Sequence, residues 1–535
     1  MRYECYGAAE AAARFVIYKH LLEVRVMEIK DKIKEVTIQG RTHYFTLNCL
    51  FIASLLAVTL LLVACGGGGG SASGSGDVQI GLTDARGDFA SYTVDVLSLT
   101  LTRQNGQVVE TLPNKTRVDF SQYTDMTEFL TIATVPGGVY VKGTLTLDYS
   151  NADIQVEDDS GNALKVNNLV DGTGTTVSQL KVSVKLQGQS RLLIAPGIPA
   201  HLTLDFDLKQ SNSVAFDNNN VPTVTVSPFL IAEVNAKTPK QHRVRGPLKA
   251  VDVATNSFGI YIHPFRQRLS NGVRHFGVLN VTADNKTVYE INGTGFTGSA
   301  GLAELALQTT LTAVIVKGDI QLNPRKFVAR EVYAGSSVPG GTLDVVRGSV
   351  MARNGNTLTV RGGTLIRTDG TAMFSDNITV LLDASTVVSK QLSAAPFAIT
   401  DISVGQRITV FGTVSADQQG HFTLDAANGH ARMHVSIARG TVLGLSSTPG
   451  NPPSYPFVLN VATINGRNAS LYDFTGTGID AANDAKRDFY EIDTGNLDIT
   501  LFAANSKVAV GGFVTSFGSA PADFTAVTIV SAPYF

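Results

Sequence analysis

Alternation of apolar and polar residues with a period of two is the pattern that most constrains the fold of this chain. It runs through residues 139–147, 180–187 and 202–208, where Val and Leu alternate with Lys, Ser, Thr and Asp. A period of two places successive side chains on opposite faces of a strand, so one face is buried and the other is solvated. Turn dipeptides such as Asn354-Gly355 and Asp369-Gly370 separate such segments. The pattern predicts many short strands joined by tight turns.

Helical periodicity is rare in the same sequence. The best short candidates are residues 299–307 (SAGLAELAL) and part of 121–132. Many short strands with frequent turns are typical of β-sandwiches and β-barrels. We therefore expect an all-β fold, in which an N-terminal β-sandwich at residues 77–237 is followed by three tandem small β-barrel or sandwich repeats.

The three repeats are assigned to residues 238–340, 341–435 and 436–535 because they share an opening sequence. Each opens on an apolar strand that contains an Arg-Gly pair, with the arginines at Arg245, Arg347 and Arg439. The repeat is longer than the ~20–50 residues of a solenoid unit, which favours independent β domains. The glycine permits a bulge or tight bend, and the arginine is expected to lie over the barrel wall. A binding role for these arginines is the alternative.

A second apolar strand that closes on glycine recurs in all three copies, at Leu311–Gly318, Arg407–Gly412 and Lys507–Gly512. The first two copies also share the motif D-x-x-T-V, at Asp284–Val288 and Asp383–Val387. The third copy has no clear equivalent of this motif. The repeat is therefore diverged in its last copy.

The longest apolar run, Leu50–Ala64, carries no charged residue and follows a segment that contains several lysines. An apolar core of this length after basic residues fits an export signal. The run ends in Leu62, Val63, Ala64 and Cys65, and this tetrapeptide resembles the lipobox of bacterial lipoprotein signals. The resemblance implies that Cys65 receives a diacylglycerol thioether and becomes the mature N-terminus after cleavage. An uncleaved membrane helix is the alternative.

The segments around the lipobox fit the same interpretation. Residues 1–26 make the region before the apolar core very long, and Met27 is the expected start of the protein. Residues 65–76 are the lipidated cysteine and a Gly/Ser linker, which is expected to behave as a flexible coil. The residue directly after Cys65 is Gly66. An aspartate at this position resembles an inner-membrane retention signal, so its absence favours the outer membrane. The expected location is the cell envelope, in the outer membrane if the host is Gram-negative.

The segment from 77 to 237 resembles an uncharacterised family of bacterial lipoprotein domains. The resemblance is carried by residues 78–85 (VQIGLTDA), by 202–208 (LTLDFDL) and by the late strand 227–231 (SPFLI). It implies a prealbumin-type β-sandwich and brings no known activity. Arg86 replaces the proline that usually follows L-T-D-A. The three repeats are similar to a second uncharacterised bacterial β-barrel domain, often found in tandem on envelope proteins.

Composition excludes several classes of protein. The formal net charge of −2 argues against a basic nucleic-acid binder, and we expect no nucleic-acid partner. Three cysteines are too few for a disulfide scaffold. A single long apolar run excludes a membrane protein with several spans.

Candidate metal ligands are few. Asp205 and Asp207 are expected on one face of a strand, about 6.6 Å apart. Carboxylates at this spacing suit Ca²⁺ only with further oxygen ligands, which Asp217 and the asparagines after it would supply. A solvated face beside a polar loop is the simpler interpretation, so no cofactor is expected. His430 and His434 are about 13 Å apart on a strand, too far to share one Zn²⁺.

Three functions remain open, and the sequence favours the first, which is not enzymatic. The first is a non-enzymatic binding, adhesion or structural lipoprotein that is attached to the membrane by its lipid and binds a polysaccharide or an envelope protein through its tandem domains. The second is an envelope hydrolase that acts on a polysaccharide or another polymer. The third is a calcium-stabilised adhesin or matrix component. No catalytic residue is assigned.

Overall fold

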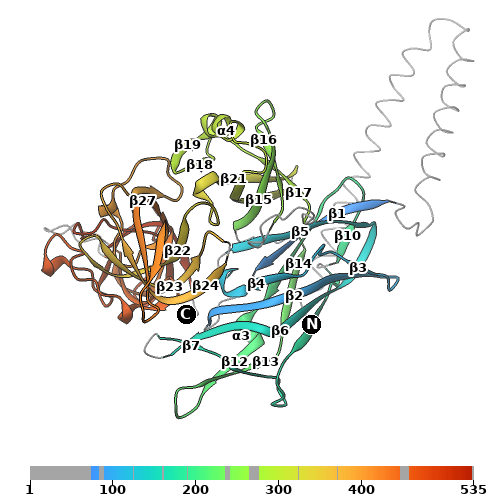
Figure 1. Cartoon of the computed structure of the whole chain (residues 1–535), viewed down its shortest axis with the longest axis horizontal. Helices are drawn as coiled ribbons and strands as arrows, with labels where there is room; N and C mark the ends of the chain where they lie inside the picture. The colour runs from blue at the N-terminus through green and yellow to red at the C-terminus, as the bar shows by residue number, and fades with distance from the viewer. Residues whose placement is uncertain are drawn as a thin grey trace, which may run out of the picture. The chain divides into compact units, whose positions relative to one another are not determined.

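Strands make up 61% of the structure and helices 7%, which confirms the all-β prediction. The computed structural model describes residues 74–532 except 84–88, 124–125, 159–161, 189–190, 235–240, 264–275, 323, 370 and 446–456 (Figure 1). The signal region with Leu62, Val63 and Ala64, the lipidation candidate Cys65 and the linker up to residue 73 lie outside the described residues. Within the described part of the chain, no helix is long and apolar enough to cross a membrane.

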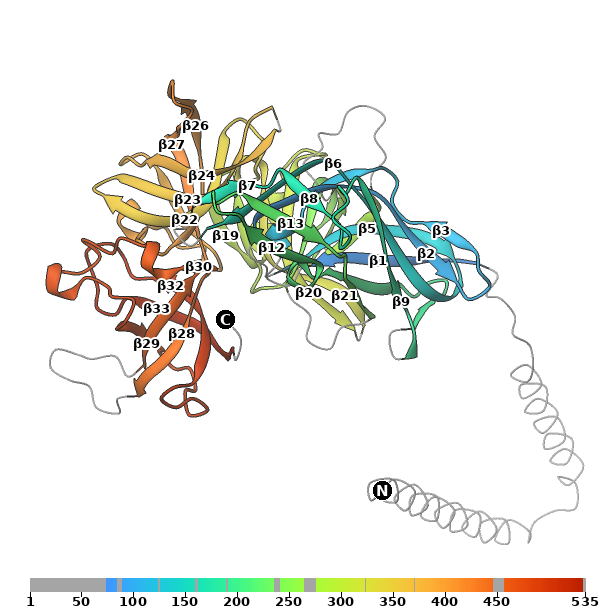
Figure 2. The same cartoon turned by 90° about the horizontal axis from the view of Figure 1, so that it is seen from below.

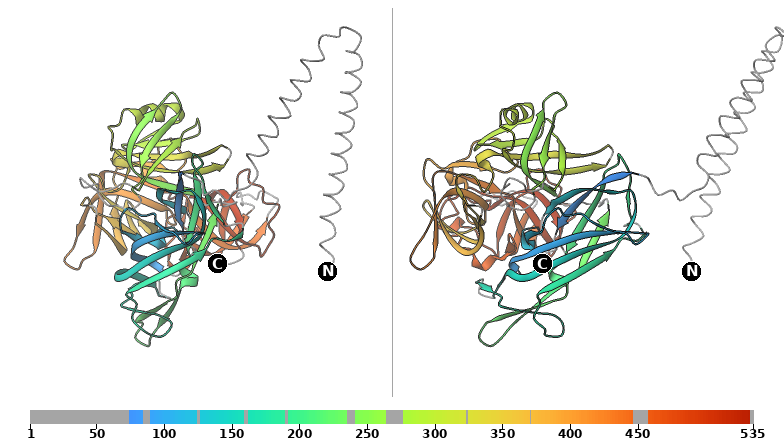
Figure 3. Two further views of the ribbon diagram at one scale, coloured as in Figure 1. Left: turned by 90° about the vertical axis from the view of Figure 1, so that its right-hand side faces the viewer. Right: turned by 45° about the vertical axis from the view of Figure 1, so that its right-hand side comes forward.

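The N-terminal unit is a sandwich of two layers around a shared core. One layer has the order β14-β11-β1-β5, with strands at Leu230–Val234, Ala200–Phe206, Ser75–Thr83 and Met126–Pro136. The other has the order β10-β6-β2-β3, with strands at Leu192–Ile194, Gly138–Glu157, Phe89–Arg103 and Val108–Glu110. Strands β4 (Thr116–Asp119), β7 (Ala163–Lys165) and β9 (Gln179–Lys185) extend this second layer. The long strands β2 and β6 run side by side (Figures 1 and 3).

The alternating pattern determines which face of each strand is buried. Leu145 and Leu147 on β6 and Val182 on β9 are buried in the sandwich core. Lys181 and Lys185 on the same strand β9 are exposed. Burial of the apolar face is the main favourable term that holds the two layers together.

A smaller three-stranded sheet adjoins the sandwich. It has the order β12-β13-β8, with strands at Asn212–Phe216, Pro222–Val226 and Asn168–Val170. A four-residue helix, α3 (Leu208–Ser211), leads into β12.

Strand β5 connects the sandwich with the first repeat. Met126–Glu128 pair in parallel with Gln241–Arg243 at the start of β15 (Gln241–Asp252). A single 11-stranded sheet therefore runs from the sandwich into the first repeat. The pairing of β5 with β1 and β15 also explains why the helical prediction for 121–132 is largely wrong. Among the described residues of this segment, 121–123 belong to a 3-10 turn, η2 (Phe120–Tyr123), and 126–132 belong to β5.

Each repeat contains five main strands with the same connections. In the first they are β15, β16 (Ser257–Tyr261), β17 (Val278–Thr282), β20 (Ala313–Leu322) and β21 (Arg325–Ala334). The first strand pairs with the second and the fourth, the second with the third, and the fourth with the fifth, all antiparallel. The third and fifth strands pair in parallel. This closed order is that of a five-stranded Greek-key barrel of the OB-fold type.

The other two repeats have the same order. The second contains β22 (Asp344–Asn354), β23 (Thr357–Ile366), β24 (Ala372–Leu381), β26 (Arg407–Ala416) and β27 (Phe422–His434). The third contains β28 (Ser436–Leu445), β29 (Phe457–Ile464), β31 (Tyr490–Asp493), β32 (Lys507–Val514) and β33 (Phe524–Ser531). Strands β28, β32 and β33 lie side by side in Figure 2. The predicted helix at 299–307 is confirmed as α4 (Gly298–Ala306), before the fourth strand of the first repeat.

The glycine of each Arg-Gly pair lies where two strands approach closely. A Cβ atom on Gly246 would lie 1.8 Å from the Tyr261 carbonyl oxygen, and one on Gly440 would lie 2.3 Å from the Asn460 carbonyl oxygen. The strand register shifts at Arg347/Ser349 and at Arg439/Gly440, as a β-bulge requires. The structural role expected for this glycine is therefore observed.

Polar contacts connect the four β units. Glu128 of the sandwich pairs with Arg243 and Arg245 of the first repeat. Oε2 of Glu157 in the sandwich lies 3.4 Å from Nη1 of Arg467 in the third repeat. The side chain of Asn465 in the third repeat donates to Ser349 Oγ of the second (3.2 Å). These contacts join the units in addition to the chain connections.

Candidate functional site

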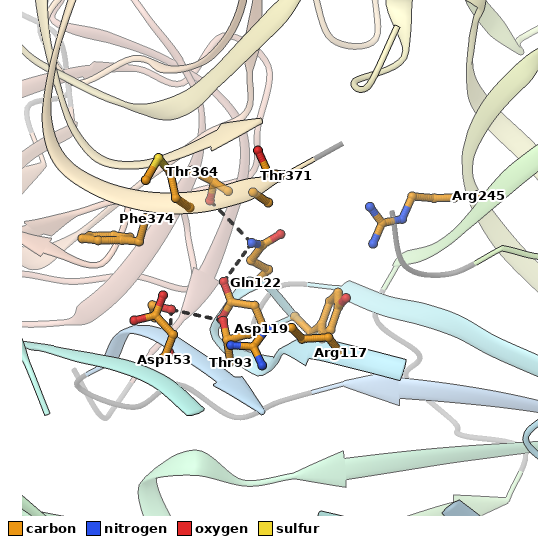
Figure 4. A pocket seen from close by; sticks show the side chains of 13 residues that line it. Thr93, Arg117, Asp119, Gln122, Asp153, Arg245, Thr364, Thr371 and Phe374 are labelled. Carbon is orange, nitrogen blue, oxygen red and sulfur yellow. Dashed lines mark hydrogen bonds between the residues drawn. The ribbon is translucent and has the colours of Figure 1, made fainter. Parts of the chain in front are cut away.

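An open cleft of about 410 Å³ lies where the sandwich meets the first and second repeats (Figure 4). The sandwich contributes residues from β2, β4, η2 and β6, the first repeat contributes β15, and the second contributes β23 and β24. The residues that line it are Ser91, Thr93, Arg117, Asp119, Gln122, Tyr123, Asp153, Arg245, Thr364, Thr371, Ala372, Met373 and Phe374. The cleft is therefore formed by residues far apart in the sequence.

Asp119, at the end of β4, organises the floor of the cleft. Its Oδ1 atom accepts hydrogen bonds from the Tyr92 amide (3.0 Å) and the Ser121 hydroxyl (2.7 Å). Its Oδ2 atom accepts one from the Gln122 side-chain amide (2.8 Å). These bonds hold the Gln122 side chain within η2, from where its Nε2 atom points to Thr364 Oγ1 of the second repeat at 3.5 Å (Figure 4).

Two arginines line the cleft, and both have acidic partners. Arg117 Nη1 lies 3.2 Å from Asp95 Oδ1, and the Arg117 side chain is 44% exposed. Arg245 Nε donates to Glu128 Oε1 (2.7 Å), and Glu128 is fully buried. Burial alone would lower the pKa of Arg245, but Glu128 and Tyr123 outweigh it and raise the pKa above its usual value. Both guanidinium groups are already paired with carboxylates, so the cleft is not strongly cationic.

Tyr123 lies beside this arginine cluster. Burial raises the pKa of its hydroxyl to about 12, so the hydroxyl is neutral and can donate a hydrogen bond. The ring also lies 5.8 Å from the guanidinium carbon of Arg243, within the range of a cation–π contact.

The remaining wall offers a carboxylate and an apolar surface. Asp153 on β6 is half-buried, and within the described residues its carboxylate has no hydrogen bond or ion pair. Met373 on β24 is 44% exposed, and Phe374 follows it on the same strand. Figure 4 shows Phe374 and Asp153 on facing walls of the cleft. A carboxylate opposite an aromatic ring can bind a ligand that has both hydroxyl groups and an apolar face.

The three aspartates considered for calcium have separate local roles. Asp205 lies within β11, where it pairs with Thr83 and Ile231 on the neighbouring strands. Asp207 follows the end of β11 and caps α3, because its carboxylate accepts from the Gln210 amide (2.9 Å). Asp217 closes a turn by accepting from the Asn219 and Val221 amides. Among the residues that the structure describes, no group of three or more His, Cys, Asp or Glu side chains could hold a metal ion.

The histidines of the second repeat have separate environments. His430 stacks on Phe411 with ring centroids 3.8 Å apart, whereas His434 Nε2 lies 2.8 Å from Thr409 Oγ1. His421 pairs with the exposed Asp417 at 3.0 Å. The structure does not bring these three imidazoles together.

Sequence reasoning missed the cleft. Of its residues only Arg245 belongs to a motif, the Arg-Gly pair, for which a binding role is the alternative interpretation. The other residues, such as Asp153 and Phe374, carry no local signal. Only the pairing of distant strands brings them to one place.

Comparison with known proteins finds one family model that matches part of the chain. Residues 75–223 match the model of a family described as a domain of unknown function (DUF4382). This agrees with the expected uncharacterised family for the N-terminal segment. No curated protein matches the chain.

One similar solved structure is described as "drosophila Unr CSD456". It is 9% identical to this chain, covers 55% of it and 98% of its own length, and has a TM-score of 0.12. Such a score carries no argument about this chain.

Proposed function

We propose that the protein is a cell-envelope lipoprotein, anchored through Cys65, that binds a saccharide unit of an envelope polysaccharide in the cleft without catalysing a reaction. The observation that carries the proposal is the cleft itself. It combines a partly buried carboxylate without a protein partner among the described residues, paired arginines, threonine hydroxyls and the Phe374 ring in one open space.

The chemistry of the lining fits a sugar better than a charged ligand. Arg117 and Arg245 have carboxylate partners, so a strong anion would have to compete with Asp95 and Glu128. A sugar hydroxyl can donate to the Asp153 carboxylate or to the oxygen of Thr371, whose own proton goes to Asp369 (2.7 Å), and this costs no charge neutralisation. The C–H face of the ring can pack on Phe374. The volume of about 410 Å³ lies within the range of small-ligand sites.

Localisation in the envelope is supported by the lipobox residues Leu62–Cys65. Two or more acyl chains anchor a protein stably, whereas one chain binds only marginally. The Gly/Ser linker that follows would hold the β units away from the bilayer surface.

The anchor is tested by the intact mass of the native protein and of a Cys65→Ala variant. We expect a mature chain that begins at Cys65 and carries added acyl mass, and we expect this species to be absent from the variant. A full-length chain without acyl mass would show that the apolar run is a membrane helix, and the anchor would have to be abandoned.

The cleft is tested by calorimetric titration with neutral oligosaccharides and with peptidoglycan fragments. We expect Phe374→Ala and Asp153→Asn each to weaken binding by at least tenfold, while Phe216→Ala, a 42% exposed aromatic on β12, leaves it unchanged. Equal binding by all variants would place the ligand elsewhere. Release of new reducing ends during the titration would identify a hydrolase instead.

A further inference from the structure

The fifth strand of the barrel is covered differently in the three repeats. In the first repeat, β18 (Val288–Ile291) pairs in parallel with residues 331–334 of β21. In the second, β25 (Val387–Lys390) pairs in the same way with residues 430–433 of β27. In the third, β31 pairs with β33 only at Phe524 and Thr525. Within the described residues, no strand covers the rest of this edge of β33.

The D-x-x-T-V motif explains why the first two repeats have this extra strand. The Thr287 hydroxyl donates to the Ala329 carbonyl of β21 (2.9 Å), and Thr386 does the same to Ala426 of β27 (3.0 Å). The amides of Asp284 and Asp383 in turn donate to these hydroxyls. The motif therefore fastens the start of the extra strand to the fifth strand. The third repeat has no clear copy of the motif.

The pairing on the other side shows which backbone groups of β33 point outward. The Ala532 amide donates to the Lys507 carbonyl (2.9 Å), and the register then pairs Val530 with Ala509. Hydrogen-bonded pairs occur at every second residue of an antiparallel ladder, so Val530, two residues before Ala532, also belongs to a hydrogen-bonded pair. The amide and carbonyl of Val530 therefore point to β32. The amides and carbonyls of Ile529 and Ser531 consequently point away from β32, to the uncovered edge.

Apolar side chains are exposed beside the same edge. Val527 is 41% exposed and Val530 is 56% exposed on β33, and Leu501 is 86% exposed on the loop between β31 and β32. A shallow groove there is lined by Leu501, Phe502, Ser506, Lys507, Ile529, Val530 and Ser531. Strand β33 (FTAVTIVS) contains no charged residue, glycine or proline. In contrast, β21 and β27 both contain charged residues.

We propose that β33 is a self-association edge, at which β33 of a second copy of this chain adds in antiparallel orientation. Natural sheets protect uncovered edges with charges, prolines or bulges. Strand β33 has one bulge, at Val527 opposite Gly511 and Gly512, and residues 528–531 beyond it form a regular, uncharged edge that can pair with another strand. In a dimer with a two-fold axis, β33 of one copy lies opposite β33 of the other. Because β33 carries no charge, this pairing brings no like charges together. The exposed Val530 and Leu501 of the two copies would be buried beside the new pair of strands.

The proposal is tested by sedimentation of the full-length native chain in detergent solution over a hundredfold range of concentration. We expect a reversible dimer whose dissociation constant rises at least tenfold in Val530→Lys and in Val527→Lys. The matched control is Val253→Lys, because Val253 is 50% exposed in the turn between β15 and β16. The control should dimerise like the native chain, so association through the lipid anchor is removed from the comparison.

Hydrogen exchange provides a readout that does not depend on a variant. The amides of Ile529 and Ser531 should become slower to exchange as the protein concentration rises. A chain that is monomeric at every concentration would overturn the proposal, and so would a dimer that Val253→Lys weakens as much as Val530→Lys. Amides that are protected in a monomer would also overturn it, because another segment or partner would then cover the edge.

Discussion

The carboxylate of Glu290 on β18 accepts a hydrogen bond from Nε of Arg432 on β27, 142 residues later in the chain, at 2.8 Å. Nη2 of Arg432 donates to the other carboxylate oxygen. Both side chains are almost fully buried, with 7% and 2% of their surface exposed. The guanidinium carbon also lies 3.9 Å from the centre of the Tyr333 ring. The pair therefore joins the first repeat to the second through a desolvated, bidentate contact.

The neighbouring Arg432 keeps the buried Glu290 carboxylate ionised. Burial alone would raise the pKa of Glu290, but Arg432, its hydrogen bonds and His430 outweigh burial and lower the pKa to about 2. A carboxylate with a lowered pKa in the folded state stabilises the protein above its unfolded pKa, and this stabilisation is lost as the pH falls to about 2. The contact is thus fully present at neutral pH.

Arg432→Met should be strongly destabilising, because it leaves the buried Glu290 charge without its partner. We expect a loss of about 3–5 kcal/mol in the free energy of unfolding at pH 7, measured with denaturant. The double variant Glu290→Leu/Arg432→Met removes both charges and should recover most of this loss. Equal destabilisation by the single and double variants would show that packing of the arginine, and not the unpaired charge, determines the cost.

His242→Phe should reduce the sensitivity of the protein to acid. His201 and His242 are buried with ring centroids 5.2 Å apart, and no described residue accepts or donates a hydrogen bond at either ring nitrogen of His242. Burial lowers the pKa of His201 to about 3 and that of His242 to about 4. A lowered histidine pKa means that the stabilisation is complete above about 6.5 and is lost as the pH falls through the folded-state values.

At pH 5 the variant should therefore gain on the order of 2 kcal/mol over the native chain, relative to their difference at pH 8. The measurement is the denaturation midpoint of both proteins between pH 4.5 and 8. Val253→Phe is the control, since Val253 is 50% exposed and carries no titratable group, so this variant should leave the pH profile unchanged. Parallel profiles for the native chain and His242→Phe would contradict the prediction.

Asp523→Asn should change the stability of the protein at high pH, whereas His242→Phe changes it at low pH. Asp523 precedes β33 and is 4% exposed, and burial raises its pKa to about 7. Since the folded-state pKa is raised, the stabilisation is complete below 3.8 and is lost as the pH rises through 7. An asparagine can still accept the Glu491 amide, which lies 2.8 Å from Asp523 Oδ2. Thermal unfolding should show the variant more stable at pH 8 by on the order of 3 kcal/mol and similar at pH 4. A constant difference at both pH values would contradict this.

Local patterns in the sequence were enough to predict the strands and the repeats. The alternation at 202–208 predicts β11 correctly, because a half-buried strand needs only a period of two. The same alternation extends two residues beyond the end of β11 at Phe206. Asp207 continues the pattern, but its carboxylate caps α3, so the two aspartates do not lie side by side on one strand.

The cleft and the buried ion pairs could not be predicted in this way. Glu290 and Arg432 sit in strands that look like any other amphipathic strand, and their contact depends on how two barrels meet. Asp153 and Thr364 line one cleft although they belong to the sandwich and the second repeat. Non-local contacts of this kind leave no periodic signal in a single sequence.

Gly440→Ala should destabilise the third barrel, whereas Gly444→Ala in the same strand should not. A Cβ atom at Gly440 would lie 2.3 Å from the Asn460 carbonyl oxygen, and a backbone atom of a paired strand cannot move away easily. Such overpacking typically costs about 1–3 kcal/mol. At Gly444 no atom of the described residues lies within 4 Å of the added Cβ, so the same chemical change meets open space among them. Thermal unfolding of the two variants measures the difference, and equal midpoints would show that the bulge at Gly440 can widen to admit a methyl group.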